Sequence, residues 1–321
     1  MNEVEAKVNT DEILLKDVIQ LLSRNLKFIL ILTGTLVLIT IIYSLFLPNV
    51  YVAESTLKPT STNTSTLPSQ ANAMAALAGI NLNNDAGDEL GVALAVLRSK
   101  ILVNKLMDYE SFLPDLMAAQ RWDPEDNRII YDQDIYDLAK KNWVRNTSFP
   151  FKPRPSSQEA FIEFSKQVTF NYDTTDNILT LSVEHISPYV AYQWSKWITK
   201  EVNAIVANFR IKEAEGSIEY LNNQVKVTPY AELRIMFYEL IKESTQSMML
   251  AKVNPEYVLT TIDPPLIPEL KSKPNRLLMV ILGALMGSIL SVLILFLRWH
   301  MWNNTNDPLE DLKKWVSSKK K

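Results

Sequence analysis

The sequence predicts an α+β fold in which two transmembrane helices flank a large extracytoplasmic domain with a small β-sheet base and long protruding helices. Two uncharged apolar runs, residues 28–47 and 277–297, are each long enough to cross a bilayer core about 30 Å thick. Residues 168–183 show the two alternating runs of a β-hairpin, and residues 187–226 repeat apolar positions at helical spacing.

The first apolar run is expected to be an uncleaved anchor. Residues 1–27 precede it and carry five acidic side chains. A secretory signal peptide has a shorter apolar stretch, of about 7–15 residues, followed by a small-residue cleavage site. Here Pro48 and Asn49 follow the run, so the sequence offers no such site.

Basic residues near the helix ends predict the orientation. Arg24 and Lys27 directly precede the first helix, Arg298 follows the second, and residues 48–57 contain neither Lys nor Arg. Lys and Arg near helix ends favour the cytoplasmic side of a membrane, so both tails are expected in the cytoplasm. The expected parts, in chain order, are a cytoplasmic tail (1–27), the first span (28–47), the outer domain (48–276), the second span (277–297) and a cytoplasmic tail (298–321).

The outer domain begins with a strand and several shorter elements. The patterns predict, in order, a strand at residues 50–59, a polar loop at 60–70, a short helix at 71–82, a helix at 88–109, and short helices at 134–145 and 157–166. Five prolines interrupt the stretch between residues 110 and 155, which is expected to be largely irregular.

The second half of the domain predicts a sheet and a long helical arm. The hairpin of residues 168–183 is expected to pair with the first strand and with a returning strand at 257–262, because an isolated hairpin is marginally stable. Ser187 and Pro188 predict a helix start, and the helix runs to about residue 226. Its apolar stripe changes phase near Phe209, which predicts different packing partners for its two ends. A second helix follows to about residue 252.

Charge and composition exclude several kinds of partner and site. Residues 48–276 carry 23 Lys and Arg against 28 Asp and Glu, so a nucleic-acid partner is not expected. The chain has no cysteine, which excludes disulfides and thiol ligands. The sequence contains no GxxxxGK[ST] nucleotide loop. We therefore expect no metal and no cofactor.

Residues suited to catalysis are few. The two histidines, His185 and His300, are expected on opposite sides of the membrane, and nothing in the sequence near His185 identifies a nucleophile. Acidic groups at residues 123–126 and 132–137 could serve a glycosidase or bind a cation, but such groups are usually solvated surface. We expect a protein that is not an enzyme.

The segment before the second span is rich in proline. Proline fixes its own φ and favours an extended conformation in the preceding residue, so a stiff, extended connection is expected. The candidate residues of this membrane-proximal segment are Pro264, Pro265, Pro268, Pro274 and Arg276.

The second span carries a small-xxx-small pattern. Gly283 and Gly287 lie four residues apart, and Ser291 extends the pattern by another four. Small residues at this spacing allow helices to approach closely in lipid, so these three are the candidate residues for transmembrane helix packing.

A family resemblance rests on these residues. Residues 251–276, AKVNPEYVLTTIDPPLIPELKSKPNR, lead into a glycine-bearing span and closely resemble the chain-length determinant (Wzz-type) polysaccharide co-polymerases. The tail sequence DEILLKDV beginning at Asp11 and the strand YVAES beginning at Tyr51 also resemble this family. The resemblance extends over essentially the whole chain, except residues 110–165.

The resemblance implies a bacterial inner-membrane protein with a periplasmic domain that forms a ring-like homo-oligomer. It implies regulation of the length of a surface polysaccharide, such as the O antigen of lipopolysaccharide, together with a separate polymerase. A lipid-linked polysaccharide is a further possible partner. Three alternatives stay open: a regulator or export scaffold for enterobacterial common antigen, capsule or exopolysaccharide, a two-span sensor, and a glycan-processing enzyme that uses Asp132 or Asp134.

Overall fold

The computed structural model describes residues 22–60 and 86–305. The chain divides into two compact units, one formed by Pro48–Ser272 and the other by Met1–Leu47 with Lys273–Lys321. The predicted helix of residues 71–82, most of the predicted loop before it and most of both predicted tails lie outside the described residues.

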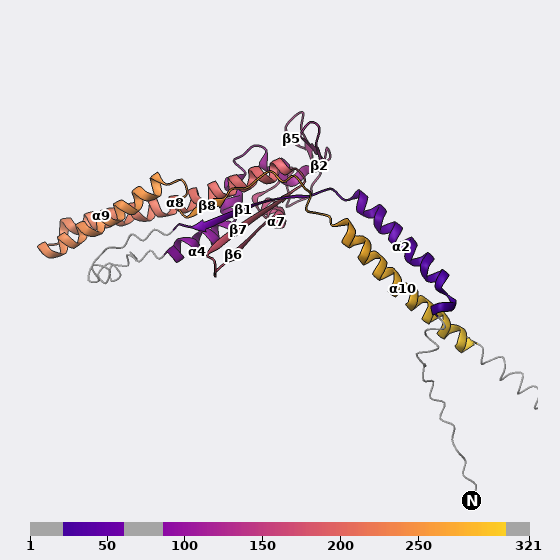
Figure 1. Ribbon diagram of the computed structural model, residues 1–321. Helices are drawn as coiled ribbons and strands as arrows, with labels where there is room; N and C mark the ends of the chain where they lie inside the picture. The colour runs from indigo at the N-terminus through magenta and orange to yellow at the C-terminus, as the bar shows by residue number, and fades with distance from the viewer. Residues whose placement is uncertain (1–21, 61–85, 306–321) are drawn as a thin grey trace, which may run out of the picture. The chain divides into compact units, whose positions relative to one another are not determined.

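The smaller unit contains two long apolar helices, α2 (Leu26–Phe46) and α10 (Arg276–Thr305). Both are long and apolar enough to cross a membrane. They lie side by side (Figure 1), and most of their large apolar side chains are exposed in the structure. Exposed apolar surface on this scale is costly in water and favourable in lipid, so the pair is compatible with a two-span membrane protein.

A four-stranded antiparallel sheet forms the base of the larger unit, in the order β6-β7-β1-β8. Its strands are β1 (Tyr51–Pro59), β6 (Val168–Asp173), β7 (Ile178–His185) and β8 (Leu259–Asp263). The predicted hairpin, the first strand and the returning strand are therefore confirmed as members of one sheet. Asp173 Oδ1 accepts a hydrogen bond from Thr175 N within the hairpin turn, which stabilises the change of direction.

Helices cover one face of this sheet. Along β7, buried residues alternate with half-buried ones, as expected for a strand with one face against a core. A long helix, α8 (Pro188–Val227), packs on β1 and β7, and the Ser195 and Ser55 hydroxyls hydrogen bond across this contact at 3.1 Å. Four shorter helices complete the core: α4 (Ala86–Leu97), α5 (Lys100–Leu106), α6 (Phe112–Ala118) and α7 (Ser157–Gln167).

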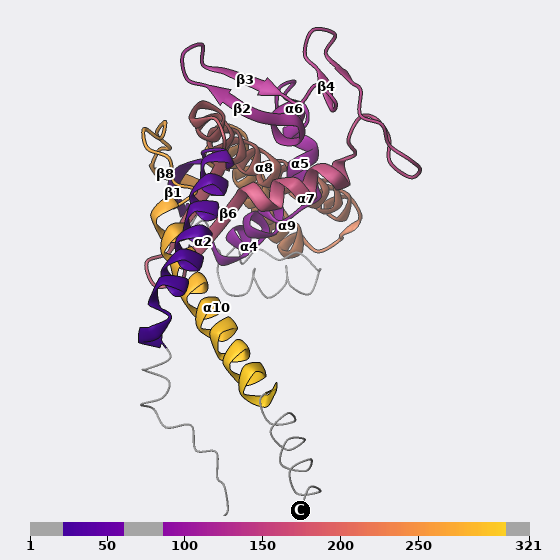
Figure 2. The ribbon, with the colours of Figure 1, turned by 90° about the vertical axis from the view of Figure 1, so that its right-hand side faces the viewer.

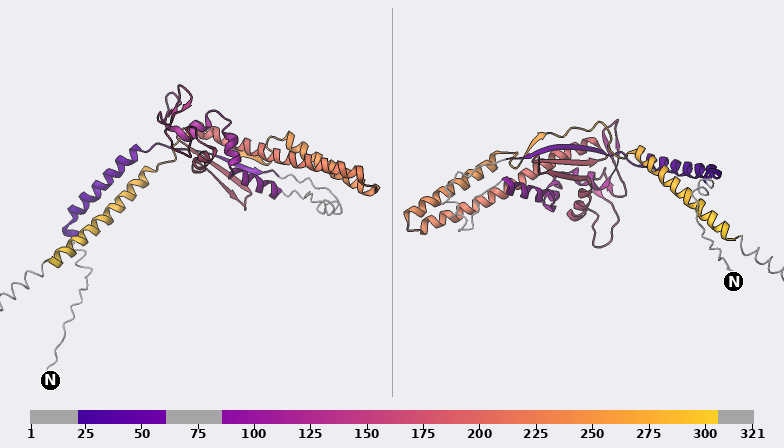
Figure 3. Two further views of the ribbon diagram at one scale, coloured as in Figure 1. Left: turned by 180° about the vertical axis from the view of Figure 1, so that it is seen from behind. Right: turned by 60° about the horizontal axis from the view of Figure 1, so that its bottom comes forward.

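The helical arm consists of α8 and α9 (Ala231–Val253), which lie against one another as an antiparallel pair (Figures 1 and 3). At 40 residues, α8 is about 60 Å long. Both predicted helices are confirmed. The arm ends far from the sheet, as both views in Figure 3 show.

The predicted helix at residues 88–109 is wrong in one respect, because two helices, α4 and α5, occupy this range. Ser99 separates them, and its hydroxyl donates to the Val96 carbonyl oxygen at 2.8 Å. Such a local bond competes with the helical ladder. After the break, Leu102 and Val103 face the core, whereas Ile101, four residues after Leu97, is half exposed.

The predicted helix at residues 134–145 is wrong, because this range forms the two-stranded hairpin β4 (Tyr136–Asp137) and β5 (Asn142–Trp143). Asp137 Oδ1 accepts hydrogen bonds from Ala139 N and Lys140 N, and Lys141 has a φ of 49°. These features favour a tight turn over a helix.

The rest of the proline-interrupted stretch is also more ordered than predicted. It contains α6 and a second hairpin formed by β2 (Ala119–Asp123) and β3 (Arg128–Tyr131), which lie beside each other in Figure 2. Pro114 is tolerated in α6 because it falls in the first turn, where backbone N–H groups have no helical partner.

Candidate functional site

The arm is joined to the sheet through the buried side chain of Asn203. Its Oδ1 accepts hydrogen bonds from the backbone N–H groups of Val258 and Leu259, both at 2.9 Å. Its Nδ2 donates to the Leu259 carbonyl at 3.0 Å and to the Thr199 carbonyl at 3.1 Å. One side chain of α8 therefore fixes the helix against the beginning of β8.

Two tyrosine–carboxylate pairs reinforce this joint. The Tyr109 hydroxyl donates to Glu201 Oε1 at 2.7 Å, and its ring stacks on Trp197 with centroids 4.1 Å apart. Burial, followed by the hydrogen bond to Glu201, raises the pKa of Tyr109 to about 12, so the phenol stays a donor. On the other side of the joint, the Tyr257 hydroxyl donates to the buried Glu89 of α4.

The two parts of the arm have different surroundings. In the sheet-packed part, residues 188–207 of α8, Trp194, Ile198 and Val202 belong to the main core. In the two-helix part, residues 208–253, Leu221 packs on Leu240 in a small separate cluster. The change of packing partners predicted near Phe209 is confirmed.

The two-helix part leaves much apolar surface uncovered. The large apolar side chains exposed there are Phe209, Tyr220, Val227, Tyr230, Ile235, Tyr238, Met249, Leu250 and Val253. Two helices packed together can bury only their facing sides, and apolar surface of this extent typically marks an interaction site. The arm is therefore the leading candidate for contacts with other molecules.

His185, at the end of β7, lies in a buried cluster with Asp115 of α6. Its Nδ1 accepts a hydrogen bond from Ser187 N at 3.0 Å, and its Nε2 lies 3.2 Å from the Asp115 carbonyl oxygen. Burial lowers the pKa of His185 to about 4, so the ring is neutral at pH 7. Because backbone groups bind both ring nitrogens, the side chain joins the end of β7 to α6 and the start of α8.

Asp115 lies in the same cluster and accepts a hydrogen bond from the Tyr131 hydroxyl at 2.6 Å. Burial raises the pKa of Asp115 to about 6, against the opposing effect of this hydrogen bond. Burial also raises the pKa of Tyr131. The pair ties β3 to α6.

The acidic groups considered for catalysis shape turns instead. Asp123 Oδ1 accepts from Glu125 N, and Asp132 Oδ1 accepts from Asp134 N. Asp137 pairs with Lys140 at 3.2 Å. Within the described ranges, no group of three or more His, Asp and Glu side chains has an arrangement that could hold a metal ion.

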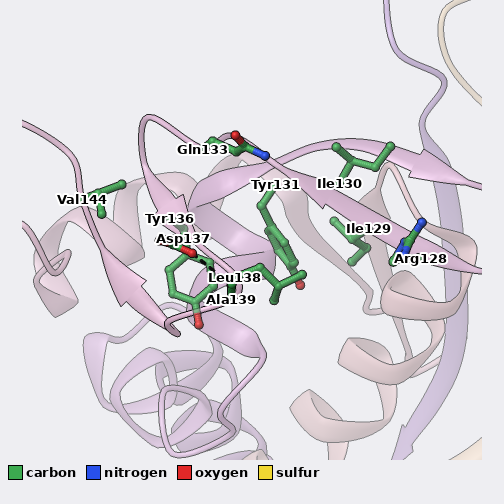
Figure 4. A pocket seen from close by; sticks show the side chains of 10 residues that line it. All are labelled: Arg128, Ile129, Ile130, Tyr131, Gln133, Tyr136, Asp137, Leu138, Ala139 and Val144. Carbon is green, nitrogen blue, oxygen red and sulfur yellow. Dashed lines mark hydrogen bonds between the residues drawn. The ribbon is translucent and has the colours of Figure 1, made fainter.

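A cavity of about 690 Å³ lies between β3 and the β4–β5 hairpin (Figure 4). Tyr131 and Tyr136 line its floor, while Leu138 and Val144 contribute apolar surface. Asp137, which also lines it, is engaged by Lys140 and by the turn described above. The lining is suited to stacking and hydrogen bonding, rather than to acid–base chemistry.

The proline segment follows β8 as an extended, non-helical stretch. Pro265 is buried, Pro268 and Pro274 are half-buried, and Pro264 is exposed. Ser272 N donates to the Val50 carbonyl oxygen at 2.9 Å, so the two chain connections leave the larger unit side by side. The role of the segment as a stiff connection stays a prediction.

The proline segment ends where α10 begins. Arg276 is the first residue of that helix. Asn275 Oδ1 accepts a hydrogen bond from Leu278 N at 3.2 Å, as an N-cap does. The helix therefore begins where the predicted span begins, within a residue.

The small residues of α10 face α2. A Cβ at Gly283 would lie 2.5 Å from Thr40 Oγ1, and a Cβ at Gly287 would lie 3.2 Å from Thr33 Cα. Ser291 is completely buried. The spacing thus serves close approach of the two helices within one chain, and any role between chains stays a prediction.

Sequence patterns did not reveal the residues of the joint or of the buried cluster. Tyr257 and Glu89 are 168 positions apart, and Tyr109 and Glu201 are 92 apart. The one available signal was Asn203, a polar residue directly beside Val202 on the apolar stripe of α8. A polar residue there requires partners, but the sequence does not say which.

The solved structures that resemble this chain include two polysaccharide co-polymerases. The first is described as a full-length bacterial polysaccharide co-polymerase; it shares 13% sequence identity, with a TM-score of 0.37 over 90% of this chain and 98% of that chain. The second, a fragment of the co-polymerase WzzB from Salmonella Typhimurium, shares 11% identity, with a TM-score of 0.29 over 70% of this chain and 100% of that one.

No family model and no curated protein sequence matches this chain. Both TM-scores given above lie below 0.5. The function is therefore argued from the residues and contacts of the chain itself.

Proposed function

We propose that this chain regulates the length of a bacterial surface polysaccharide, the O antigen of lipopolysaccharide, as an oligomeric co-polymerase of the inner membrane. Several protomers assemble side by side into a ring, which acts together with a separate polymerase. The protein makes and breaks no glycosidic bond. Its arm and base supply contacts and geometry to the polymerase or to the lipid-linked growing chain.

The observation that carries this proposal is the arm. The 40-residue helix α8 is held to the sheet by buried hydrogen bonds and then continues beyond it, where Leu221 packs on Leu240 of α9. A long arm with uncovered apolar surface is expensive for a protein that works as a monomer. It is suited to a protein that assembles with copies of itself.

The membrane topology agrees with this role. Two helices able to span a bilayer enclose the larger unit in sequence. The positive charge beside their outer ends, at Arg24, Lys27 and Arg298, supports cytoplasmic tails. Under this proposal, Pro48–Ser272 lies in the periplasm, where lipid-linked polysaccharide is polymerised.

The sequence resemblance indicates the kind of polymer whose length this protein regulates. The proline segment and the glycine-bearing span of residues 251–297 are the features that this chain shares most specifically with chain-length determinants. The catalytic alternative is weakened by positive observations, because His185 and the acidic residues considered above are engaged in structural hydrogen bonds.

A gene deletion tests the proposal directly. Deletion should broaden or shift the O-antigen length distribution on a gel while polymer continues to be made, and the intact gene should restore it. The Asp132→Asn and Asp134→Asn variants should restore it equally well, because neither carboxylate performs chemistry.

An unchanged O-antigen length distribution on the gel would contradict the assignment of this protein to the O antigen. The same strain then distinguishes the remaining alternatives, since a change confined to enterobacterial common antigen, capsule or exopolysaccharide would assign the protein to that polymer. Unchanged lengths for all of these would refute a role in chain-length control and leave the two-span sensor.

A further inference from the structure

Residues 138–154 differ sharply in charge from the rest of the larger unit. They contain five basic residues and no acidic one, whereas residues 48–276 as a whole have an excess of five acidic residues. The basic residues are Lys140, Lys141, Arg145, Lys152 and Arg154. A concentrated basic segment in an acidic domain marks a surface suited to an anionic partner.

The loop that follows β5, residues 146–154, is held firmly at its base. Arg145 donates from Nε to the Pro153 carbonyl at 2.6 Å and from Nη2 to the Lys152 carbonyl at 2.7 Å. Its Nη1 lies 2.7 Å from Glu159 Oε2, and both of these side chains are mostly buried. Glu159 also completes the capping box of α7, so the loop is anchored to a helix of the core.

The tip of this loop exposes two aromatic rings. Phe149 is 98% exposed and Phe151 is 55% exposed. The Phe151 backbone N–H donates to the Ser148 carbonyl oxygen at 3.0 Å, which closes a turn around Phe149. Among the described residues nothing covers the Phe149 ring, and an apolar ring that an anchored turn presents to water is expected to be covered by a partner.

Two cations follow these rings closely in the sequence. Lys152 and Arg154 are exposed, and neither forms an ion pair with another described residue. By contrast, Lys140, Lys141 and Arg145 pair with Asp137, Glu110 and Glu159. The free charges of the segment are therefore close in sequence to the exposed rings.

The strand before the loop, β5, lies in the part of the larger unit from which the chain leaves toward α2 and α10 (Figures 1 and 3). Trp122 of β2 contacts Tyr51, the first residue of β1, with ring centroids 5.5 Å apart. Tyr136 of β4 packs on Trp143 of β5, which leads into the loop. Figures 1 and 3 show β2 and β5 at the end of this unit opposite the tip of the arm.

The chain connections are short. Three residues lie between Phe46, at the end of α2, and Val50, and three lie between Ser272 and Arg276, at the start of α10. The four Cα–Cα steps of each connection span at most about 14 Å when extended. If α2 and α10 cross a membrane, as the proposed function requires, the Val50 and Ser272 edge lies near the lipid headgroups.

We propose that residues 146–154 form a lipid-docking loop that inserts Phe149 and Phe151 among headgroups while Lys152 and Arg154 bind their phosphates. This inference rests on the two-span topology of the proposed function. Aromatic rings favour the membrane interface, and cations beside them favour anionic lipids. The loop is a third contact with the membrane, and it limits the tilt of the base relative to the bilayer.

An anionic lipid surface fits this loop better than a protein partner does. The rings and cations sit on one narrow turn, which offers little area for a stable protein interface. A turn of this kind can enter a headgroup layer without a preformed pocket on the other side.

The absence of cysteine makes a direct test possible with the full-length chain. Ser148→Cys places a fluorescent label beside both rings and keeps them intact. The protein is reconstituted in nanodiscs of phosphatidylethanolamine and phosphatidylglycerol that contain a headgroup spin-labelled lipid. Quenching is compared with that of a label at Val227→Cys, at the tip of the arm, where the side chain is 73% exposed.

We expect the label at residue 148 to be quenched at least about threefold more strongly than the label at residue 227, because spin-label quenching requires close approach. Within the Ser148→Cys chain, the pair Lys152→Glu and Arg154→Glu should remove most of the quenching, as should Phe149→Ser with Phe151→Ser. The matched control pair, Lys226→Glu with Lys242→Glu on the arm, should have no effect. Replacing phosphatidylglycerol by phosphatidylcholine should weaken the quenching.

A label at Pro48→Cys separates failure of this inference from failure of the proposed topology. Quenching at residue 48 without quenching at residue 148 would overturn the lipid-docking loop while leaving the two spans in place. Absence of quenching at both positions would overturn the topology and the loop together. Quenching at residue 148 that survives both pairs of loop substitutions would also overturn the assigned roles of these four side chains.

Discussion

The sheet-packed part and the two-helix part of the arm share one continuous helix but have unequal support. Residues 188–207 of α8 contribute Trp194, Ile198 and Val202 to the main core and use Asn203 to bind β8. Beyond them, Leu221 and Leu240 are the centre of a cluster whose other members, Phe237 and Ile241, are only partly buried.

This difference separates the part of the arm that the sheet supports from the part that, under the proposed function, neighbouring copies support. A helix packed on a sheet is stabilised by the burial of its apolar side, whereas two helices alone bury little surface. The exposed apolar side chains of the two-helix part then favour association with further copies. We infer that assembly stabilises the part of the arm that the base does not.

The largest expected effect comes from breaking the sheet-packed part. Trp194 is 1% exposed, and its ring centroid lies 4.8 Å from that of Phe112. Trp194→Ala should lower the free energy of unfolding of the whole larger unit by about 3–5 kcal/mol, because it leaves a large cavity. Denaturant unfolding in mild detergent measures this.

Trp194→Phe is the matched control for that change. The indole N–H of Trp194 has no hydrogen-bond partner among the described residues, so phenylalanine loses volume but no bond. We expect a smaller loss, of about 1–2 kcal/mol. Equal losses for the two variants would contradict the view that packing is the contribution of this side chain.

A cavity in the two-helix part should have a local effect. Leu221→Ala removes the centre of the small cluster and should cost about 3 kcal/mol of local stability. Hydrogen exchange should then accelerate in residues 208–253 and stay unchanged in the sheet strands. If the strands also exchanged faster, the two parts of the arm would unfold as one cooperative unit. That result would contradict the unequal support of the two parts described above.

The base should also show a pH dependence that comes from its buried side chains Asp115 and His185. Burial raises the pKa of Asp115 from 3.8 to about 6, so its contribution to stability is full below pH 4 and is lost as the pH rises toward 6. Burial lowers the pKa of His185 from 6.5 to about 4, so its contribution is present above pH 6.5 and is lost as the pH falls toward 4.

In the natural chain, the contributions of Asp115 and His185 to stability change in opposite directions with pH. Asp115→Asn should leave the His185 dependence, so stability would fall by on the order of 2–3 kcal/mol between pH 6.5 and pH 4. His185→Gln should leave the Asp115 dependence and give a rise over the same range. Unfolding free energies measured at several pH values test the signs, and parallel profiles for the two variants would contradict this account.

The smallest expected effect on stability comes from the surface of the two-helix part. Tyr238 is 58% exposed, so Tyr238→Ser should change the free energy of unfolding of a protomer by less than about 0.5 kcal/mol. The same change should shift full-length protein in mild detergent from assemblies toward protomers, as seen by light scattering. A matched exposed polar change, Asn222→Ser, should leave the assembly intact.

Elements defined by local pattern were predictable from the sequence. The alternation of residues 168–183 and the apolar stripe of α8 each depend on a periodicity that a single segment contains, and both were confirmed. The strand at the start of the domain and the returning strand were found for the same reason.

Elements decided by side-chain hydrogen bonds were not predictable. The turn made by Asp137 and the break at Ser99 depend on local bonds that compete with a helix of acceptable composition. The joint at Asn203 and the pair of Asp115 and Tyr131 depend on partners brought together only by the fold. The candidate residues Gly283 and Gly287 were identified from spacing, but only the structure shows Thr40 and Thr33 opposite them.

Hydrogen exchange of the full-length protein, as assemblies and as separated protomers, tests the central claim most directly. The account predicts that residues 208–253 exchange at least about tenfold faster in separated protomers, while residues 188–207 stay equally protected in both. Equal protection of residues 208–253 in both states would show that neighbouring copies do not stabilise the arm, and the account would be wrong.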